Sequence, residues 1–524
     1  MSQRQRDLLI LFGLALLVNG AVALLVSRPG YTDSYYYFNG GKFLADGQGL
    51  VEPYRWNYVN APASLPAPGF DFWQPLPAFL SAAGIILFGR AAPFDSAQWV
   101  FVLVAACLPP LTYLMASRFG TRRQALIAGL LAVFSGYYVI YWSLPESFAP
   151  FALAGGGCLY VLAITADRQQ WPLWLAAGAL SGLAHLTRAD GLLLLGIALL
   201  TAFIRPGRRW LSALLVVAGY LAVMAPWFYR NQLAFGSPLA PGGINAVWLT
   251  QYNDLFNYPQ NLSAARFLAS GWPAIIRVKL DVLVTNLESF VAVQNLIVLT
   301  PLTVIAAWRR WRDPKLWPAL ADQAGVFVAM TFVFSLPGKN GGYFHSAGAL
   351  LPATFTLATL GLDDAIGWGA ARRHWKGTSA RRVFGAAVVA IAGLLTLFLV
   401  TGRVVGLPLN GQVAWNTTDS VYQTIGDRLS QLGEGASVRV MSNNPAGFYY
   451  FTGRGGMPVP NGGEEMLLRA AHDYQLKYLV LDWNVPDGLK PLYASGPVST
   501  RLKLVETYGS APHLVYLYRI EDQP

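Results

Sequence analysis

The sequence is dominated by long apolar runs that are separated by short polar connections. A helix needs about 20 residues to cross the ~30 Å hydrocarbon core of a bilayer, because it rises about 1.5 Å per residue. Hydrophobic residues make up 54% of the 524-residue chain and charged residues only 12%, about half the share of a soluble domain. We predict a polytopic α-helical membrane protein with about eleven transmembrane helices, near residues 8–27, 98–116, 124–142, 149–166, 171–187, 191–205, 210–228, 289–307, 318–336, 346–366 and 384–402.

Basic residues gather in alternate connections between these runs, at 117–123, 205–210, 308–313 and 371–382. Short loops rich in Lys and Arg stay on the cytoplasmic side of a membrane. The net charge of +11 is therefore explained by orientation and by contact with anionic lipids, and no nucleic-acid partner is expected. We predict a protein of a prokaryotic inner or plasma membrane, with its N-terminus in the cytoplasm.

The opposite side of the membrane receives the long segments of the chain. By parity these are the loops 28–97 and 229–288 and everything from residue 403 onward. One apolar stretch, residues 74–90, is too short for the hydrocarbon core, and we predict a re-entrant or juxtamembrane segment there. Residues 1–402 thus form the predicted membrane domain.

The composition changes at the end of the last apolar run. After residue 403 the segments "YQTIGDRLSQL" and "EEMLLRAAHDYQL" have helical periodicity, whereas "SVRVMSNN", "YLVLDW" and "HLVYLYRIE" read as short strands. Alternating helices and strands are typical of a small α/β unit. Residues 403–524 are therefore predicted to form a soluble extracytoplasmic α/β domain.

Three acidic residues on the extracytoplasmic side are candidates for catalysis. Asp33 closely follows the first apolar run, Asp71 precedes the short apolar stretch, and Glu146 lies in a tight turn between two runs. A carboxylate in this position can act as a general base. Asp is also a favoured helix N-cap, so for Asp33 the capping and catalytic interpretations both stay open.

Cationic and hydrogen-bonding residues at the same side are candidates for binding phosphate. Arg presents a planar fork that suits phosphate, and Lys presents a point charge. The alternative is that Arg188 pairs locally with Asp190 while Arg230 and Lys339 only extend to the membrane interface. The candidates are Arg188, Arg230, Lys339, Tyr343 and His345.

The remaining reactive residues form no motif of a cofactor site, and no cofactor is expected. Cys107 and Cys158 are isolated in apolar segments, without a CxxC pair or the His/Cys spacing of a metal site. The stretch "GKNGG" is too short for a phosphate-binding P-loop.

Several of these stretches together resemble the GT-C superfamily of integral-membrane glycosyltransferases. They are the Asp that follows the first helix, "WQPLP" at the end of a long first external loop, "LTRADGLL", and "PWFYRNQLAFGSPL" before a second large loop. The pattern is most similar to the protein O-mannosyltransferase and lipid A aminoarabinose transferase branches. The resemblance covers residues 1 to about 400.

This resemblance implies a sugar donor linked to polyprenyl phosphate, an active site at the outer membrane face, and usually inversion at the anomeric carbon. Asp33 matches the catalytic base of the first loop, Asp71 an acidic position near the family's Pro-Pro-Leu element, and Glu146 an Asp of the second external loop. The acceptor would be a lipid, a glycan or a protein. The donor phosphate would contact the cationic candidates, Arg188, Arg230, Lys339 and His345.

The chain also departs from the family pattern. Ser34 follows Asp33 where O-mannosyltransferases have an acidic pair, and Gln74 precedes a single Pro. No Asp-x-Asp occurs in the second external loop, which argues against the metal-dependent oligosaccharyltransferase branch. We therefore expect no required metal. Two other interpretations stay open: a transporter or flippase of lipids or lipid-linked sugars, and an inert scaffold with a GT-C-like architecture.

Overall fold

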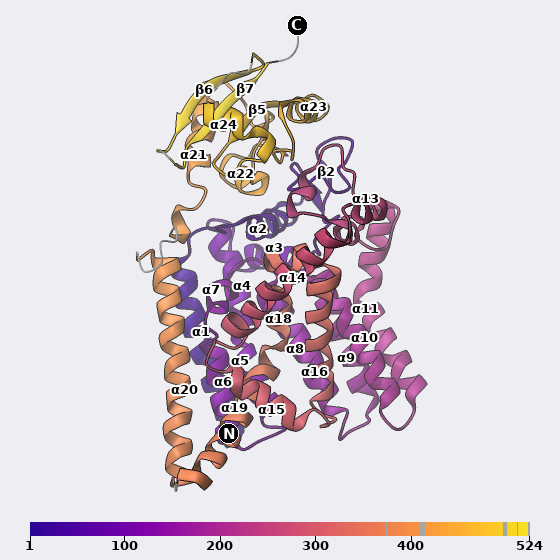
Figure 1. Cartoon of the computed structure of the whole chain (residues 1–524), viewed down its shortest axis with the longest axis vertical. Coiled ribbons are helices and arrows are strands. Elements are labelled where there is room, and N and C mark those ends of the chain that lie inside the picture. The colour runs from indigo at the N-terminus through magenta and orange to yellow at the C-terminus, as the bar shows by residue number, and fades with distance from the viewer. Residues whose placement is uncertain (374, 408–413, 496–499, 511, 522–524) are drawn as a thin grey trace.

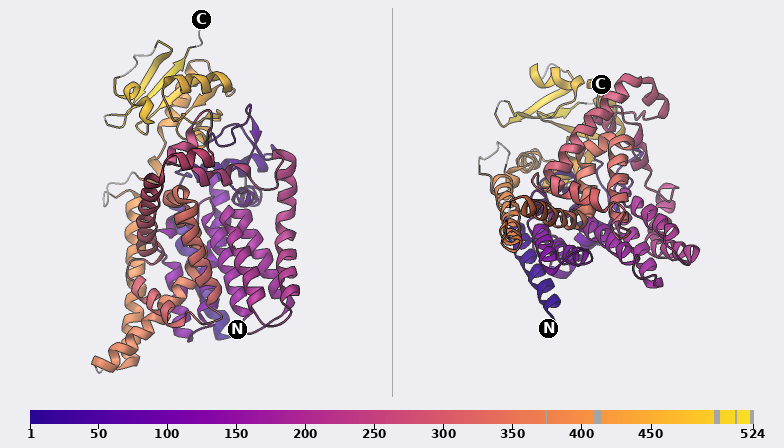
Figure 2. Two further views of the ribbon diagram at one scale, coloured as in Figure 1. Left: turned by 45° about the vertical axis from the view of Figure 1, so that its right-hand side comes forward. Right: turned by 60° about the horizontal axis from the view of Figure 1, so that its bottom comes forward.

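The computed structural model describes residues 1–373, 375–407, 414–495, 500–510 and 512–521. Long helices run side by side in a bundle, and a small sheet domain covers one end of it (Figures 1 and 2). The bundle helices are α1 (Gln3–Leu25), α4 (Pro93–Ala106), α5 (Leu108–Ala116), α6 (Arg122–Val133), α7 (Tyr138–Trp142), α8 (Phe148–Ile164), α9 (Trp171–Thr187), α10 (Leu192–Ile204), α11 (Arg209–Phe235), α14 (Trp272–Glu288), α15 (Thr300–Arg310), α16 (Trp317–Val328), α19 (Leu351–Arg373) and α20 (Gly377–Val400).

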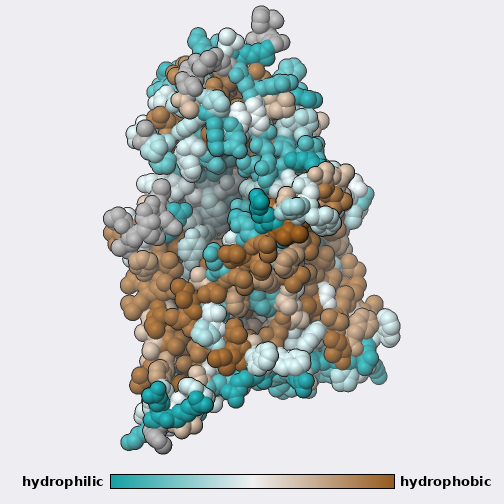
Figure 3. Space-filling view, in the orientation of Figure 1, coloured by the Kyte–Doolittle hydropathy of each residue, from teal (hydrophilic) through white to brown (hydrophobic). Residues whose placement is uncertain are grey.

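The bundle carries an apolar outer surface. Leu17, Leu214 and Leu394 are each more than 60% exposed on its helices, and Figure 3 shows a hydrophobic belt below a hydrophilic cap. Such a belt is stable when lipid rather than water surrounds it. Five helical stretches in the described part of the chain are long and apolar enough to cross a membrane: Gln3–Leu25, Pro93–Ala116, Arg209–Phe235, Ser335–Arg373 and Gly377–Val405.

The protein is therefore an integral membrane protein, as predicted. The shorter apolar helices Phe148–Ile164, Ala189–Ile204 and Trp317–Val333 lie among the long ones. They coincide with predicted spans, and the count of eleven stays a prediction.

The basic connections meet at the end of the bundle that carries the N-terminus. Arg122 forms an ion pair with Asp7 (Nε to Oδ2, 2.6 Å), and Arg123 pairs with Asp363. Arg310 pairs with Asp364 (Nη1 to Oδ2, 2.6 Å). The C-terminal domain lies at the opposite end (Figure 1).

Helices α2 (Thr32–Ala45) and α3 (Leu76–Phe88) pack together at the end near the C-terminal domain (Figure 1). Their contact is close at Gly41, where a Cβ atom would lie 2.4 Å from Cβ of Ser81. Helix α3 has 13 residues, about 20 Å at 1.5 Å per residue, so it is too short to cross a bilayer unaided. It is the segment predicted to be re-entrant or juxtamembrane.

The connections at this end contain short elements. Two residues each of β1 (Val51–Glu52) and β2 (Ala67–Pro68) pair antiparallel in the first loop. The second long loop contains α12 (Pro241–Asn245), the 3-10 helix η3 (Tyr252–Phe256) and α13 (Ala264–Ala269). Helices α17 (Ser335–Pro337) and α18 (Tyr343–Ala347) precede α19.

The C-terminal domain contains a five-stranded sheet in the order β4-β3-β5-β7-β6. Strands β4, β3 and β5 are parallel, and β7 and β6 join them antiparallel. The predicted alternation of helices and strands is confirmed, although β6, β4, α22 and α24 were not predicted. The elements are α21 (Val421–Gln431), β3 (Arg439–Met441), α22 (Pro445–Thr452), β4 (Gly456–Met457), α23 (Glu464–Tyr474), β5 (Leu476–Leu481), α24 (Lys490–Ser495), β6 (Leu502–Tyr508) and β7 (Val515–Ile520).

This domain docks directly on α2. Asn39 Nδ2 donates to the carbonyl of Ala446 in α22 (2.9 Å), and the rings of Tyr35 and Tyr450 lie 5.1 Å apart. The backbone N–H of Arg55 donates to the carbonyl of Gly456 in the edge strand β4 (3.0 Å). Contacts with the C-terminal domain and with the first loop therefore hold α2 in position.

Candidate active site

Helix α2 places Asp33 in its first turn. The helix begins after Gly30, and its N-cap is Tyr31, which makes no side-chain capping bond. The alternative that Asp33 is the N-cap is therefore wrong. Its carboxylate instead lies beside Glu146 and His345, and one ligand atom from each of the three residues lies within 4.8 Å of the others.

Glu146 and His345 are held in place by neighbours on the turn before α8. Glu146 is 1% exposed and accepts a hydrogen bond from the backbone N–H of Phe148 (2.9 Å). The His345 ring stacks on the Phe148 ring, with centroids 3.9 Å apart. Nδ1 of His345 lies 3.1 Å from the Ser147 hydroxyl and 3.3 Å from Oε1 of Glu146.

The helical conformation is interrupted before α18, and this interruption helps to position His345 in the cluster. Asn340 and Gly341 have non-helical backbone angles, and φ of Gly341 is +103°. This region costs little for glycine and is unfavourable for other residues. The chain resumes as α18 at Tyr343, with His345 buried at 8% exposure.

Arg188 supplies positive charge next to this cluster. Its Nε donates to Oδ1 of Asp190 (2.9 Å), and the Ser346 hydroxyl donates to the other oxygen of Asp190. The local Arg188–Asp190 pair, which was the alternative interpretation of "RAD", is confirmed. The ion pair leaves Arg188 close enough for its charge to act on both Asp33 and Glu146.

Burial raises the pKa of both carboxyl groups, and that of Glu146 further than that of Asp33. Burial raises the pKa of Asp33 to about 6, although the charge of Arg188 opposes the rise. Burial, followed by the charge of Asp33, raises the pKa of Glu146 to about 8. Burial therefore favours the protonated form of both groups, and more strongly that of Glu146, a difference that suits a base role for Asp33 and a donor role for Glu146.

Asp71 lies in a different buried cluster, within the first loop. Nη1 of Arg55 donates to Oδ1 of Asp71 (2.7 Å) and to Oε2 of Glu52 (2.8 Å). The Tyr36 hydroxyl, on α2, donates to Glu52, and so does the backbone N–H of Phe70. These contacts tie the loop to α2 and favour a structural role for Asp71 over the predicted catalytic role.

The other predicted residues lie outside the Asp33 cluster. Arg230 lies 4.9 Å from the ring centroids of Trp227 and Phe235, and Lys339 pairs with Asp281 of α14. The Tyr343 hydroxyl donates to Gln294 Oε1 (2.9 Å). Their roles in phosphate binding stay predictions.

The sequence analysis missed several neighbours of the cluster. Ser147 directly follows Glu146, and Ser346 directly follows His345. Tyr252 of η3 lies within the range of the electrostatic interaction with Asp33. The two serines could have been noticed as polar residues next to predicted ones. Tyr252 has no such signal, because only the folding of the second loop brings it to α2.

The three residues of the cluster could also hold a divalent metal ion. Two carboxylates and an imidazole are a donor set that ions such as Zn²⁺ and Mn²⁺ accept. The expectation of no required metal came from the missing Asp-x-Asp of the second external loop, and a sequence motif does not show donors that meet only in three dimensions. It stays a prediction, with a direct test below.

The helical bundle, the two external loops and the buried cluster under a small sheet domain define a membrane protein with the GT-C glycosyltransferase fold. Residues 68–229 match the family model described as dolichyl-phosphate-mannose-protein mannosyltransferase. No curated protein sequence is significantly similar to the chain.

Solved structures support the same fold. The chain is similar to ArnT from Cupriavidus metallidurans bound to undecaprenyl phosphate, with a TM-score of 0.56 and 15% identity, over 98% of this chain and 97% of that one. It is also similar to the Archaeoglobus fulgidus oligosaccharyltransferase with zinc and sulfate (0.58, 14%, 98% and 73%). The archaeal oligosaccharyltransferase AglB from Archaeoglobus fulgidus, with an inhibitory peptide and dolichol-phosphate, gives 0.54 and 12% over 98% and 74%. The predicted resemblance to GT-C enzymes is confirmed.

Proposed function

We propose that the protein transfers a sugar from a polyprenyl-phosphate donor to an acceptor at the extracytoplasmic face of the membrane. The observation that carries this proposal is the convergence of Asp33, Glu146 and His345 from three distant segments into one buried cluster. The cluster lies at the end of the bundle opposite the basic connections, which the positive-inside rule assigns to the cytoplasm. The GT-C fold and the family match support a glycosyl transfer there.

In this account Asp33 is the general base. Its carboxylate takes the proton of the acceptor hydroxyl while the hydroxyl oxygen forms a bond to the anomeric carbon. The bond from that carbon to the phosphate oxygen breaks, and its electron pair leaves with the lipid phosphate. The attack from the opposite face inverts the anomeric carbon. Glu146, protonated at pH 7, donates a hydrogen bond within the site, and the charge of Arg188 stabilises the negative charge that develops.

The test is the fate of the donor in the presence of the purified wild-type chain. A panel of radiolabelled polyprenyl-phosphate sugars is incubated with the protein and a membrane extract, and labelled acceptor and free polyprenyl phosphate are measured. We expect one donor to be cleaved or transferred. Movement of an intact donor across proteoliposomes without cleavage would favour the flippase, and neither binding nor cleavage would favour the scaffold.

The rate of transfer should show a bell-shaped dependence on pH. The rate is expected to rise as Asp33 loses its proton near pH 6 and to fall as Glu146 loses its proton near pH 8. Initial rates between pH 4.5 and 9.5 at subsaturating donor report these groups in the free enzyme. In Glu146→Gln the upper limb should disappear, and an unchanged upper limb would contradict the role of Glu146.

Removal of divalent metals should leave the transfer rate unchanged, because a carboxylate base and a cationic site need no metal. Protein is dialysed against EDTA, metal content is measured by elemental analysis, and transfer is compared before and after. Loss of transfer that Mn²⁺ or Zn²⁺ restores would contradict the metal-free account. It would make Asp33, Glu146 and His345 ligands.

A further inference from the structure

The turn between α9 and α10 carries a cation and an anion within three residues. Arg188 is the C-cap of α9, with extended backbone angles, and the 3-10 helix η1 (Ala189–Gly191) leads into α10. Gly191 packs against the end of α9, where a Cβ atom would lie 2.3 Å from the carbonyl carbon of Ala184. A larger residue does not fit there unless this backbone moves. The turn therefore holds Arg188 and Asp190 in fixed relative positions.

The guanidinium of Arg188 is bonded on one side only. Its Nε donates to Oδ1 of Asp190 (2.9 Å), and its Cζ lies 5.6 Å from the centroid of the Phe151 ring on α8. The terminal nitrogens Nη1 and Nη2 carry four of the five N–H groups. Neither donates to a residue that the structure describes. A guanidinium with this free edge suits an anion that presents two oxygens, such as a phosphate.

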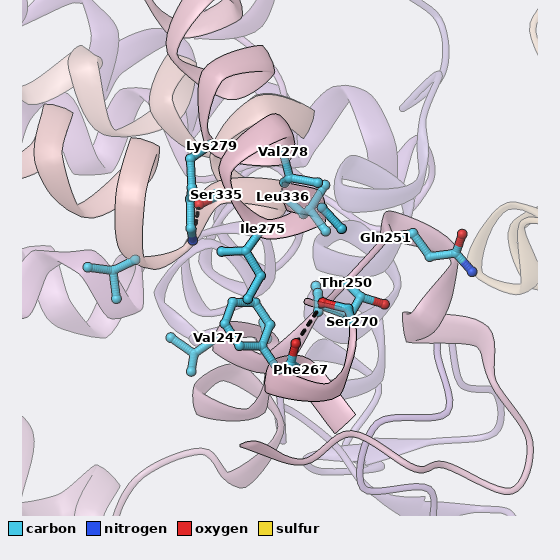
Figure 4. Close-up of a pocket in the computed structure, with 14 residues that line it drawn as sticks. Val247, Thr250, Gln251, Phe267, Ser270, Ile275, Val278, Lys279, Ser335 and Leu336 are labelled. Atoms are coloured by element: carbon cyan, nitrogen blue, oxygen red, sulfur yellow. Dashed lines mark hydrogen bonds between the residues drawn. The ribbon is translucent and has the colours of Figure 1, made fainter. Parts of the chain in front are cut away.

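Arg188 lies beside the Asp33 cluster, and its charge acts on all three residues of that cluster. Another external cation, Lys279, has a different environment. It donates to the Ser335 hydroxyl (2.6 Å) in a separate cavity of about 240 Å³ that residues of α13, α14 and α17 line (Figure 4). Arg188 is therefore the cation that is placed to stabilise negative charge developing next to Asp33.

Asp190 is held from two sides. Its Oδ1 accepts from Arg188, and its Oδ2 accepts from the hydroxyl of Ser346. Ser346 is fully buried and directly follows His345 on α18. The Asp190 side chain is only 9% exposed. The carboxylate thus connects α18 to Arg188, and both of its oxygens have partners that keep it in one orientation.

The charge of Asp190 has two opposite effects on an anionic substrate. It partly cancels the charge of Arg188 and so weakens the attraction for a phosphate. It also orients the guanidinium in advance, so that less freedom is lost when the phosphate arrives. Orientation matters most in the chemical step, because a displacement of about 1 Å can lower a rate about 10²-fold.

We propose that Asp190 is a positioning residue, which orients the guanidinium of Arg188 so that Nη1 and Nη2 face the departing phosphate of the donor. Asp190 contacts no substrate in this account, because it acts through Arg188 and is held in turn by Ser346. The proposal rests on the proposed function, since this phosphate is the leaving group of that reaction. Loss of Asp190 should therefore lower the rate of the chemical step more than the affinity for the donor.

The test is a double-mutant cycle on single-turnover sugar transfer by the purified full chain, with donor affinity measured separately. Asp190→Ala should lower the rate by about 10- to 100-fold and change donor affinity less than about threefold. Arg188→Gln should lower the rate by about 10²- to 10³-fold. Adding Asp190→Ala to Arg188→Gln should lower it by less than about twofold more, because the group that Asp190 positions is then absent. A merely structural residue would lower the rate equally in both backgrounds.

Three further variants complete the cycle. In Asp190→Asn the amide oxygen can still accept from Nε, so this variant should recover most of the lost rate. Ser346→Ala should lower the rate by up to about tenfold, and only when Arg188 is present. This variant keeps the proposal testable if Asp190→Ala does not fold. The matched control is Asp46→Ala, which removes another aspartate from a pair with a cation (Lys42, 2.5 Å) and should keep near wild-type transfer. Melting temperatures show whether each variant remains folded.

An experimental structure of Asp190→Ala separates this proposal from the proposed function. We expect the Arg188 side chain to leave its position over the Phe151 ring, and an unmoved side chain would overturn the proposal. If the side chain moves but wild type transfers no sugar, the proposed function fails and the orienting role of Asp190 stands. If wild type transfers sugar and Asp190→Ala matches its rate, or lowers the rate independently of Arg188, the positioning role fails and the proposed function stands.

Discussion

Replacing Asp33 by Asn is expected to lower the rate of sugar transfer by about 10²- to 10⁴-fold, the usual contribution of a general base. The amide is similar in size to the carboxylate but cannot take the proton of the acceptor hydroxyl. Donor binding should change little, because in the proposed mechanism Arg188 and not Asp33 interacts with the donor phosphate. The measurement is single-turnover transfer at saturating donor, with donor affinity determined separately.

Asp46→Asn provides the control for this substitution. Asp46 follows α2 at the end opposite Asp33 and pairs with the exposed Lys42 (2.5 Å), so the control removes a charge near the same helix without touching the cluster. We expect it to keep near wild-type transfer. Full transfer by Asp33→Asn would remove Asp33 from the mechanism and leave it as a charge in the first turn of α2.

Replacing Arg55 by Met is expected to lower the free energy of unfolding by about 3–5 kcal/mol, because two buried carboxylates would lose their shared cation. Glu52 and Asp71 are 3% and 5% exposed, and both accept from Nη1 of Arg55. The free energy of unfolding is measured by reversible denaturation in detergent. The exposed Lys42 gives the comparison, since Lys42→Gln should cost less than about 1 kcal/mol.

A substitution of Asp71 distinguishes a structural role of this residue from a catalytic one. If Asp71 serves the fold, Asp71→Asn should lower stability, while transfer per folded molecule stays within about tenfold of wild type. A loss of transfer comparable to that of Asp33→Asn, in a variant that melts like wild type, would restore Asp71 as a catalytic residue. An Arg55→Met variant as stable as wild type would contradict the structural role.

The sequence predicted the fold best where long apolar runs mark the helices. Apolar runs of bilayer length predicted the helices, and the positions of Asp33, Glu146 and His345 at ends of runs on one side predicted that they share a membrane face. The three residues do lie together in the structure, while the membrane face and their roles stay proposals.

The sequence could not predict the contacts within the long loops, or which polar side chains of a helix are buried. Asp71 and Arg55 lie in a long loop with no periodicity, so nothing in the sequence indicates that they pair. Lys279 stands two residues from Arg277 in "IIRVKLDVL", and only the fold shows that Arg277 is exposed while Lys279 lines a cavity. Strand β6 was missed because its pairing with β7 shifts register between Leu504 and Glu506, which breaks the alternation of apolar residues.

The most direct test of the central claim is an experimental structure of the full chain with a non-cleavable phosphonate analogue of the donor that the panel identifies. The account predicts the anomeric carbon beside the carboxylate of Asp33, within the Asp33, Glu146 and His345 cluster, and the phosphonate on the side of Arg188. A donor bound with its anomeric carbon away from Asp33, for example in the groove formed by Tyr58, Tyr258 and Asp473 under the C-terminal domain, would contradict it.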